Sequence, residues 1–225
     1  MTLPDTGTVE YRQPRFVPPA GSTVILLVRH GESAPARPGQ SFPMVLGRGD
    51  PELAPDGVEQ AQRVCARLAK GTLDAIYVTP LRRTQQTAAP LAEATGLTPA
   101  VVEDLIEVGL GEWEGGLFRQ RVAENHPVAA RMWAEERWDV IPGAESSEDL
   151  VARTRRAILR IAAEHPDQQV AAFVHGGVIG AILAEAARSR PFAFSGADNG
   201  SLSVLVVTPD RWIVRSYNDS SHLEG

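Results

Sequence analysis

The sequence predicts an α/β protein, a three-layer sandwich in which helices cover both faces of a central sheet. Two observations predict this class. Short apolar strand patterns alternate with helical patterns along most of the 225 residues, and the chain closes with two strand patterns joined by a turn. The hydrophobic fraction of 43% is enough for one sizeable core. We therefore expect one domain over residues 23–225, after an extended or disordered arm over residues 1–22 that is rich in Pro, Thr and Gly.

The first expected strand covers residues 23–27, where β-branched and leucine side chains lie between Gly21 and Gly31. Such an uninterrupted apolar run is typical of a strand buried on both faces. Gly31 predicts a turn that lets the backbone approach a ligand closely. Residues 33–51 are rich in Pro and Gly and predict loops around the end of this strand.

The first helix is expected to start at Pro55, with Ala54 where a capping Ser or Thr would be usual, and to end before Gly71. Its apolar side chains recur at helical spacing and predict the inward face: Val58, Ala61, Val64, Cys65 and Leu68. Cys65 is therefore expected to be a buried, unreactive thiol.

A second strand over residues 75–78 precedes a helix that carries Arg83 and stops at Gly96. Residues 113–142 predict a helical insertion. A third helix starts at Ser146 or Ser147 and ends before Pro166, and its expected inward stripe is Val151, Thr154, Ile158 and Ile161. Residues 170–174 predict a strand that leads into a fourth helix, and residues 201–207 and 212–217 predict an antiparallel hairpin.

Charge and cysteine content exclude several classes of function. The 22 basic and 28 acidic residues give a net charge of −6, which argues against a nucleic-acid or anionic-membrane partner but allows a local positive pocket for a small anion. The one cysteine rules out an internal disulfide and favours a reducing compartment. Neither a membrane-spanning stretch nor a signal-peptide pattern is present, so we expect a cytoplasmic protein. A homodimer contact through Tyr11, Phe16 and Val17 is left open.

The five histidines and one cysteine are scattered without metal-ligand spacing, and a Walker-type phosphate loop is absent. We therefore expect neither a metal nor a cofactor.

The chemistry is expected at strand ends. The first strand runs into Arg29 and His30, and ligands of open α/β sheets bind just beyond the carboxyl ends of strands. An imidazole beside a permanent cation there predicts a histidine that attacks or binds a phosphate. Three further motifs follow in order, at residues 79–88, 105–115 and 170–179, with shorter ones at 47–51 and 142–146.

Taken together and in this order, these motifs resemble the histidine phosphatase superfamily, also called the phosphoglycerate-mutase-like or RHG family. The resemblance spans about residues 23 to 223. It implies a mostly parallel six-stranded sheet with one antiparallel strand.

The resemblance also implies roles for individual residues. His30 is the nucleophile, because a neutral imidazole can form a phosphohistidine intermediate. Arg29, Arg83 and His175 hold the transferred phosphoryl group, whose charge spreads over its oxygens. The register of the second motif selects Arg83, which leaves Arg82 as a solvated helix residue.

Glu107 is implied as the general acid and base, with Glu112 and Glu114 as rivals if the register is displaced. Glu145 and Glu32 are expected to hold arginine side chains or turns. We expect Arg37 and the backbone N–H of Gly176 to bind substrate. The insertion aromatics are expected to pack in a core or lid, and one or two of them to line the leaving-group pocket: Trp113, Phe118, Trp133 and Trp138.

The best interpretation is a cofactor-independent phosphatase that hydrolyses small phosphomonoesters through a phosphohistidine on His30. One alternative is phosphoglycerate-mutase-type phosphoryl transfer. Mutases usually place an Asn on the phosphate where this chain has Ala36, although Arg37 could substitute in part. The other alternative, a module that binds phosphorylated ligands without catalysis, does not explain why a nucleophile and an acid are present together.

Overall fold

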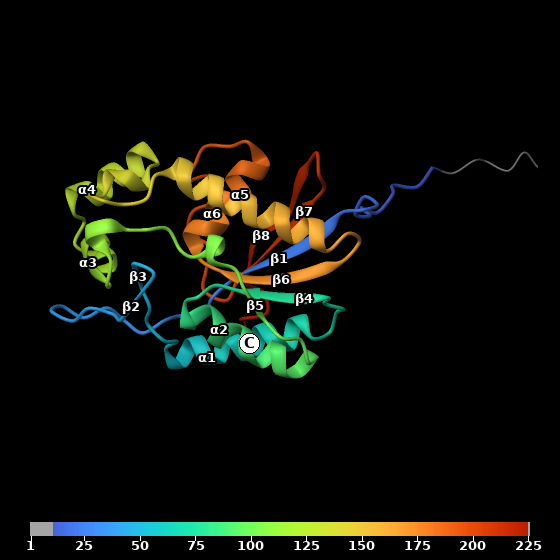
Figure 1. Ribbon diagram of the computed structural model, residues 1–225, viewed down its shortest axis with the longest axis horizontal. Helices are drawn as coiled ribbons and strands as arrows, with labels where there is room; N and C mark the ends of the chain where they lie inside the picture. The colour runs from blue at the N-terminus through green and yellow to red at the C-terminus, as the bar shows by residue number, and fades with distance from the viewer. Residues whose placement is uncertain (1–10, 225) are drawn as a thin grey trace, which may run out of the picture.

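The computed structural model describes residues 11–224 (Figure 1). Part of the predicted arm, residues 1–10, lies outside the described residues. Residues 11–19 form no helix or strand, and Tyr11 and Val17 are exposed. The guanidinium of Arg215 lies 3.7 Å from the ring centre of Phe16, which ties this segment to the last strand.

The central sheet has six strands in the order β5-β4-β6-β1-β7-β8. Their bounds are β1 Thr23–Arg29, β4 Ala75–Val78, β5 Ala100–Val101, β6 Gln169–Val174, β7 Leu202–Val207 and β8 Trp212–Asp219. β5, β4, β6 and β1 are parallel, whereas β7 runs antiparallel to both β1 and β8. The prediction of a mostly parallel sheet with one antiparallel strand is confirmed.

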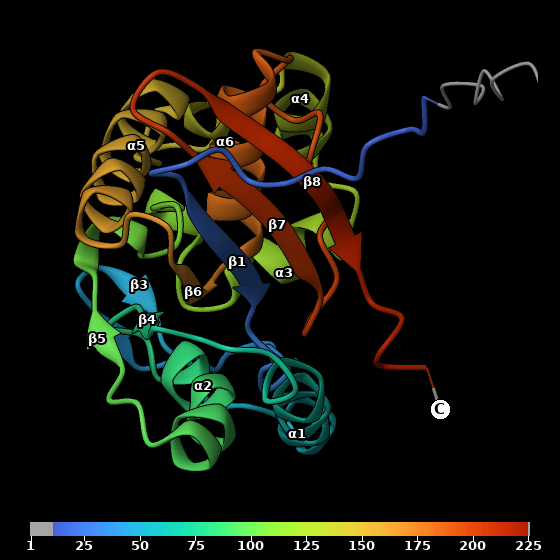
Figure 2. The same ribbon diagram turned by 90° about the vertical axis from the view of Figure 1, so that its right-hand side faces the viewer.

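Two helices cover each face of this sheet (Figures 1 and 2). α1 Pro55–Leu68 and α2 Arg82–Thr95 lie on one face, and α5 Ser147–Glu164 and α6 Gly176–Ala187 lie on the other. The side chains of β1 alternate between two cores. Ile25 and Leu27 belong to the core under α5 and α6, while Val28 belongs to the core under α1 and α2. The predicted burial of this strand on both faces is therefore confirmed.

The helix ends follow their local sequence signals. α1 begins at Pro55 behind an uncapped Ala54, and α2 ends at Gly96 with a left-handed φ of 70°. The Ser146 side chain caps α5 by accepting from the backbone N–H of Asp149.

The predicted inward faces of α1 and α5 are confirmed in part, because the following predicted residues are buried: Ala61, Val64, Leu68, Thr154, Ile158 and Ile161. Val58 is 51% exposed, Cys65 is only half-buried, and the buried stripe of α1 is Gly57, Ala61, Val64 and Leu68. Gly57 is turned inward because it packs against the backbone after β1: a Cβ on Gly57 would lie 2.0 Å from the carbonyl oxygen of Glu32. In α5, Leu150 is fully buried, whereas Val151 is partly buried.

The residues after the Glu107 motif form a helical layer beyond the carboxyl ends of the parallel strands. It contains α3 Leu117–Ala123, α4 Pro127–Glu135 and a 3₁₀ turn at Trp138–Val140. Two further 3₁₀ turns, Glu103–Leu105 and Gly111–Trp113, precede it. Trp113, Met132 and Ile141 form a small core of their own. A short hairpin of β2 Met44–Val45 and β3 Arg48–Gly49 lies on the same side of the sheet (Figure 1). None of the described helices is long and apolar enough to cross a membrane.

Candidate active site

Three neighbouring parallel strands deliver the site residues. Arg29 ends β1, His30 follows it directly, Thr79 follows β4, and His175 follows β6. The backbone N–H of His30 donates to the carbonyl of Val174 over 3.0 Å, which fixes the end of β1 against the end of β6. The two histidine rings lie edge to face with their centres 5.2 Å apart.

The hydrogen bonds of His30 define its tautomer. Nδ1 lies 2.7 Å from the carbonyl oxygen of Gly31, which can only accept, so Nδ1 carries the proton and Nε2 a lone pair. Arg83 Nε donates to that lone pair over 3.1 Å. Burial, followed by the charges of Arg83 and Arg29, holds the pKa of His30 well below its ordinary value. His30 is therefore a neutral imidazole with a nucleophilic nitrogen.

Residues 79–88 place Arg83 next to His30 and connect α2 to the residue after His30. Arg83 is 6% exposed, and its Nη1 donates to the carbonyl of Gly49 over 2.9 Å. Thr87 Oγ1 donates to the Arg83 carbonyl and accepts from the backbone N–H of Gly31. Burial lowers the pKa of Arg83 to about 10, which leaves it cationic at neutral pH. Arg82 is not simply solvated, as we had expected: its Nε binds the buried carboxylate of Asp50 over 3.0 Å.

His175 and Arg29 each present an unsatisfied nitrogen. His175 is fully buried, and its Nε2 lies 3.0 Å from Thr79 Oγ1. Arg29 donates through Nη1 to the carbonyl of Ala197. Of the buried side-chain nitrogens in the described residues, two lack a hydrogen-bond partner, and these are His175 Nδ1 and Arg29 Nε. Leaving buried polar groups unpaired costs about 1–3 kcal/mol each, so the site is built for a polar ligand.

Glu107 lines the same pocket as His30 and Arg83. Its Oε1 accepts from the backbone N–H of Val108 over 2.9 Å, and its Oε2 lies 3.4 Å from the N–H of Gly177. The rival Glu114 has both oxygens engaged, by the N–H groups of Gly49 and Leu110. Glu112 lines neither pocket at the site.

Glu145 holds two arginines, as predicted, and together they clamp the backbone of Glu107. Arg48 Nε and Arg153 Nη2 both donate to the Glu107 carbonyl, each over 3.1 Å. Glu145 binds Arg153 at 2.6 Å and Arg48 at 3.3 Å, and it also accepts from the backbone N–H of Gly109. We call Arg48, Glu145 and Arg153 the Glu145 clamp.

Comparison with known proteins decides the family. The model of the histidine phosphatase superfamily (branch 1) matches residues 25–220. The chain belongs to this superfamily. The prediction of a histidine phosphatase, an enzyme that hydrolyses small phosphomonoesters, is thereby confirmed.

Individual relatives agree with this assignment. Phosphoglycerate mutase-like protein 4 of Arabidopsis thaliana is 34% identical over 89% of this chain and 86% of its own length. Phosphoserine phosphatase 1 of Hydrogenobacter thermophilus is 32% identical over 88% of this chain and 93% of its own. Among solved structures, a mycobacterial glucosyl-3-phosphoglycerate phosphatase superposes with a TM-score of 0.75 at 29% identity, covering 88% of this chain and all of that one.

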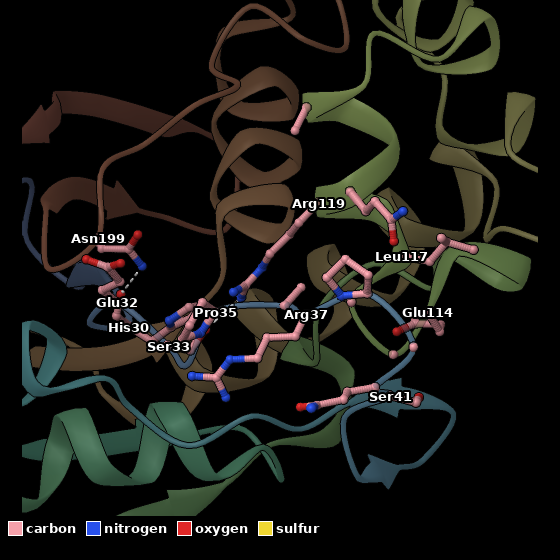
Figure 3. A pocket seen from close by; sticks show the side chains of 18 of the residues that line it. His30, Glu32, Ser33, Pro35, Arg37, Ser41, Glu114, Leu117, Arg119 and Asn199 are labelled. Atoms are coloured by element: carbon pink, nitrogen blue, oxygen red, sulfur yellow. Dashed lines mark hydrogen bonds between the residues drawn. The ribbon is translucent and has the colours of Figure 1, made fainter.

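Two pockets of this histidine phosphatase have His30 in their walls. The inner pocket, of about 220 Å³, is lined by Arg83, Glu107 and three of the four predicted aromatics: Trp113, Phe118 and Trp138. The fourth, Trp133, is 46% exposed and packs against Phe192 outside both pockets. The outer pocket, of about 700 Å³, lies between residues 32–41 and α3 (Figure 3).

Neither of the two predicted substrate ligands lines the inner pocket. Arg37 is exposed and lines only the outer pocket. Gly176 lines neither pocket; a Cβ there would lie 3.4 Å from Arg29 Nε, so its small size leaves room for that arginine. Gly31 also has another role than we had expected, because a Cβ on it would lie 2.4 Å from the Gly57 carbonyl of α1.

Sequence reasoning missed two residues of the site. Asn199 donates to the His30 carbonyl over 2.9 Å and lines the outer pocket. Arg119 lines both pockets and donates to Ser33 Oγ over 2.7 Å. Neither carries a local signal, because Arg119 is one of two arginines on an amphipathic helix and Asn199 stands in a turn. Only the fold brings them to His30.

Proposed function

We propose that this enzyme hydrolyses small phosphomonoesters in two displacements through a phosphohistidine on His30. Nε2 attacks phosphorus, the bond from phosphorus to the ester oxygen breaks, and Glu107 donates its proton to the departing oxygen. Glu107, now a carboxylate, then removes a proton from water. The oxygen of that water attacks the phosphohistidine, which releases inorganic phosphate and restores Nε2.

One observation carries this proposal: buried nitrogens without a hydrogen-bond partner belong to Arg29, which directly precedes His30, and to His175, whose ring centre lies 5.2 Å from that of His30. A phosphoryl group bonded to Nε2 would place its oxygens within reach of both nitrogens. Arg83 Nε donates a hydrogen bond to Nε2 in the free protein. With the phosphoryl group in place, the same N–H would donate its hydrogen bond to a phosphoryl oxygen instead. Phosphoryl transfer depends largely on such positioning and charge stabilisation.

The remaining parts of the proposal follow from the sequence. We propose a cytoplasmic enzyme because cysteine is nearly absent. We further propose that residues 23–225 act as one catalytic domain, with 113–142 as its insertion. Its partner is a small phosphorylated metabolite, and neither nucleic acid nor a membrane is part of this function.

The test is rapid-quench trapping with a ³²P-labelled phosphomonoester at neutral pH. The expected result is an acid-labile, base-stable phosphoenzyme that disappears in His30→Ala and persists in His165→Ala. His165 is a suitable control because it lies at the end of α5, outside both pockets, where it hydrogen-bonds Tyr77 of β4. Label on another residue, or turnover by His30→Ala above a trace, would refute the mechanism. Recovery of label in an alcohol acceptor rather than in phosphate would assign mutase-type transfer instead.

A further inference from the structure

Resting on the proposed function, we propose that Thr79 is a positioning residue that acts through His175. Its hydroxyl donates a hydrogen bond to His175 Nε2 and so keeps the ring proton on Nδ1, which donates it in a hydrogen bond to the phosphoryl group. Thr79 directly follows β4, and His175 directly follows β6, the neighbouring strand of the sheet. Both side chains are fully buried, and 3.0 Å separate Thr79 Oγ1 from His175 Nε2.

One nitrogen of the His175 ring is available to a ligand. Among the described residues, Thr79 is the one hydrogen-bond partner of this side chain, and it binds Nε2. Nδ1 is buried without a partner, in a ring whose centre lies 5.2 Å from that of His30. Burial, followed by the charge of Arg83, holds the pKa of His175 well below its ordinary value. The ring is therefore neutral and carries a single proton.

The phosphoryl group determines where that proton has to be. An unprotonated phosphoryl oxygen can only accept a hydrogen bond, so Nδ1 can bind it only when Nδ1 carries the proton. Nε2 then has a lone pair, and the group beside it has to be a donor. The hydroxyl of Thr79 meets this requirement, whereas a carbonyl or carboxylate oxygen in its place would hold the proton on Nε2.

The neighbours of Thr79 leave its proton to His175. This proton has two acceptors at the same distance, because Thr84 Oγ1 and His175 Nε2 each lie 3.0 Å from Thr79 Oγ1. Thr84 Oγ1 already accepts from the backbone N–H of Thr79 over 3.1 Å and donates to the Leu81 carbonyl over 2.8 Å. Thr84 is therefore satisfied without the Thr79 proton, whereas Nε2 has no other donor among the described residues.

The two histidines of the site thus hold the same tautomer by opposite means. At His30, the Gly31 carbonyl accepts from Nδ1 and leaves a lone pair on Nε2. At His175, the Thr79 hydroxyl donates to Nε2 and leaves the proton on Nδ1. One neutral imidazole is thereby prepared to attack phosphorus, and the other to donate to a phosphoryl oxygen.

The direct test is two-bond ¹H–¹⁵N NMR of the ¹⁵N-histidine-labelled enzyme saturated with vanadate. The signals of His175 are identified by their loss in His175→Gln. In the wild type, Nδ1 should be protonated, and Nε2 should give the signal of a lone pair that accepts a hydrogen bond. Thr79→Val keeps the shape of the side chain but lacks the hydroxyl, so the Nε2 signal should lose the shift caused by this hydrogen bond. Thr79→Ser should restore it.

Turnover gives a second readout. Thr79→Val should lose about 10- to 100-fold in kcat/KM, roughly the contribution of one hydrogen bond to a charged group. Because that hydrogen bond reaches the phosphoryl group and not the leaving group, alkyl and p-nitrophenyl phosphates should lose by the same factor. Thr79→Ser should recover most of the rate.

Thr154→Val is the matched control, because Thr154 is also a buried threonine, and its hydroxyl donates to the Leu150 carbonyl within α5. This variant should match the wild type in turnover and in the signals of His175.

A protonated Nε2 in the wild-type vanadate complex would overturn the inference. So would a wild-type rate in Thr79→Val, or a loss of rate that Thr79→Ser does not restore. Rapid-quench trapping on the same preparations keeps the two proposals apart. Absence of label on His30 in the wild type refutes the proposed function, whereas label on His30 together with a protonated Nε2 on His175 removes only the role of Thr79.

Discussion

Arg83 donates a hydrogen bond to the lone pair of His30, with 3.1 Å between Arg83 Nε and His30 Nε2. In the proposed mechanism, this guanidinium binds the lone pair of His30 in the free enzyme and the phosphoryl group once substrate is present. Because the imidazole is buried and faces two arginines, it resists protonation.

Replacing Arg83 should raise the pKa of His30. Burial is the largest cause of the low pKa and remains in Arg83→Met, but the variant removes the next cause, the charge of Arg83. A raised pKa means that His30 becomes protonated, and so inactive, at a higher pH than in the wild type. Side-chain ¹⁵N NMR titration of the histidines, together with the acid limb of kcat/KM, measures this change. An unchanged or lower pKa in the variant would contradict it.

Glu107→Gln should slow hydrolysis according to the leaving group. An alkyl phosphate departs as a strongly basic alkoxide, so loss of the proton donor should cost about 10²–10⁴ in rate. A p-nitrophenolate departs without a proton, and its phosphorylation step should change far less. Rapid-quench rates of phosphohistidine formation for both substrates provide the measurement. Equal losses would remove Glu107 from the role of acid and bring forward Glu114, which also lines the inner pocket.

Glu145→Gln should cause a smaller loss of rate than Glu107→Gln, with the same dependence on the leaving group. Glu145 holds Arg48 and Arg153 on the carbonyl of Glu107, so weakening it misplaces the acid without removing it. We expect alkyl phosphates to lose about tenfold in kcat, less than the roughly 10²–10⁴ expected for loss of the acid itself, and p-nitrophenyl phosphate to lose less. Glu148→Gln, an exposed change in the first turn of α5, is the control and should match the wild type. A loss that is independent of the leaving group would mean that the clamp is only structural.

Gly57→Ala should destabilise the fold. The added Cβ would lie 2.0 Å from the Glu32 carbonyl, so the loop after the nucleophile or α1 must move, at a cost of about 1–3 kcal/mol in the free energy of unfolding. Gly71→Ala is the matched control, because its nearest neighbour would be 3.8 Å away. The measurement is urea denaturation of both variants. Equal midpoints would show that α1 adjusts to the added Cβ without a loss in the free energy of unfolding.

Chelation should leave turnover unchanged, since the proposed charges at the phosphate come from Arg29, Arg83 and His175. The described residues hold no group of three or more His, Cys, Asp or Glu side chains that could bind a metal ion. Activity should therefore persist after dialysis against EDTA, while vanadate should inhibit competitively because it resembles the transferred phosphoryl group. A loss on dialysis that added divalent metal restores would disprove the metal-free mechanism.

The sequence by itself determined five of the six strands of the central sheet, all but the two-residue β5, together with several helix ends and the residues that follow β1, β4 and β6. These features are local: apolar runs specify β1 and β6, Gly96 ends α2, and Ser146 caps α5. Strand ends of a parallel sheet meet at one edge, so His30 and His175 were predictable as neighbours. The family resemblance added Arg83 and Glu107 to this group.

Tertiary structure alone decided which side chains from distant parts of the sequence lie near His30. Arg119 comes from the insertion and Asn199 from the turn before β7, and their contacts with Ser33 and His30 span 86 and 169 residues. Arg37, close to His30 in sequence, is instead carried outward by its loop. The rotation of α1 was predictable only in part: hydrophobic spacing predicted Ala61, Val64 and Leu68 on the inward face, but not the close contact of Gly57 with the Glu32 backbone. Spacing along a chain reports local geometry, whereas steric fit and long-range charge depend on how the elements pack.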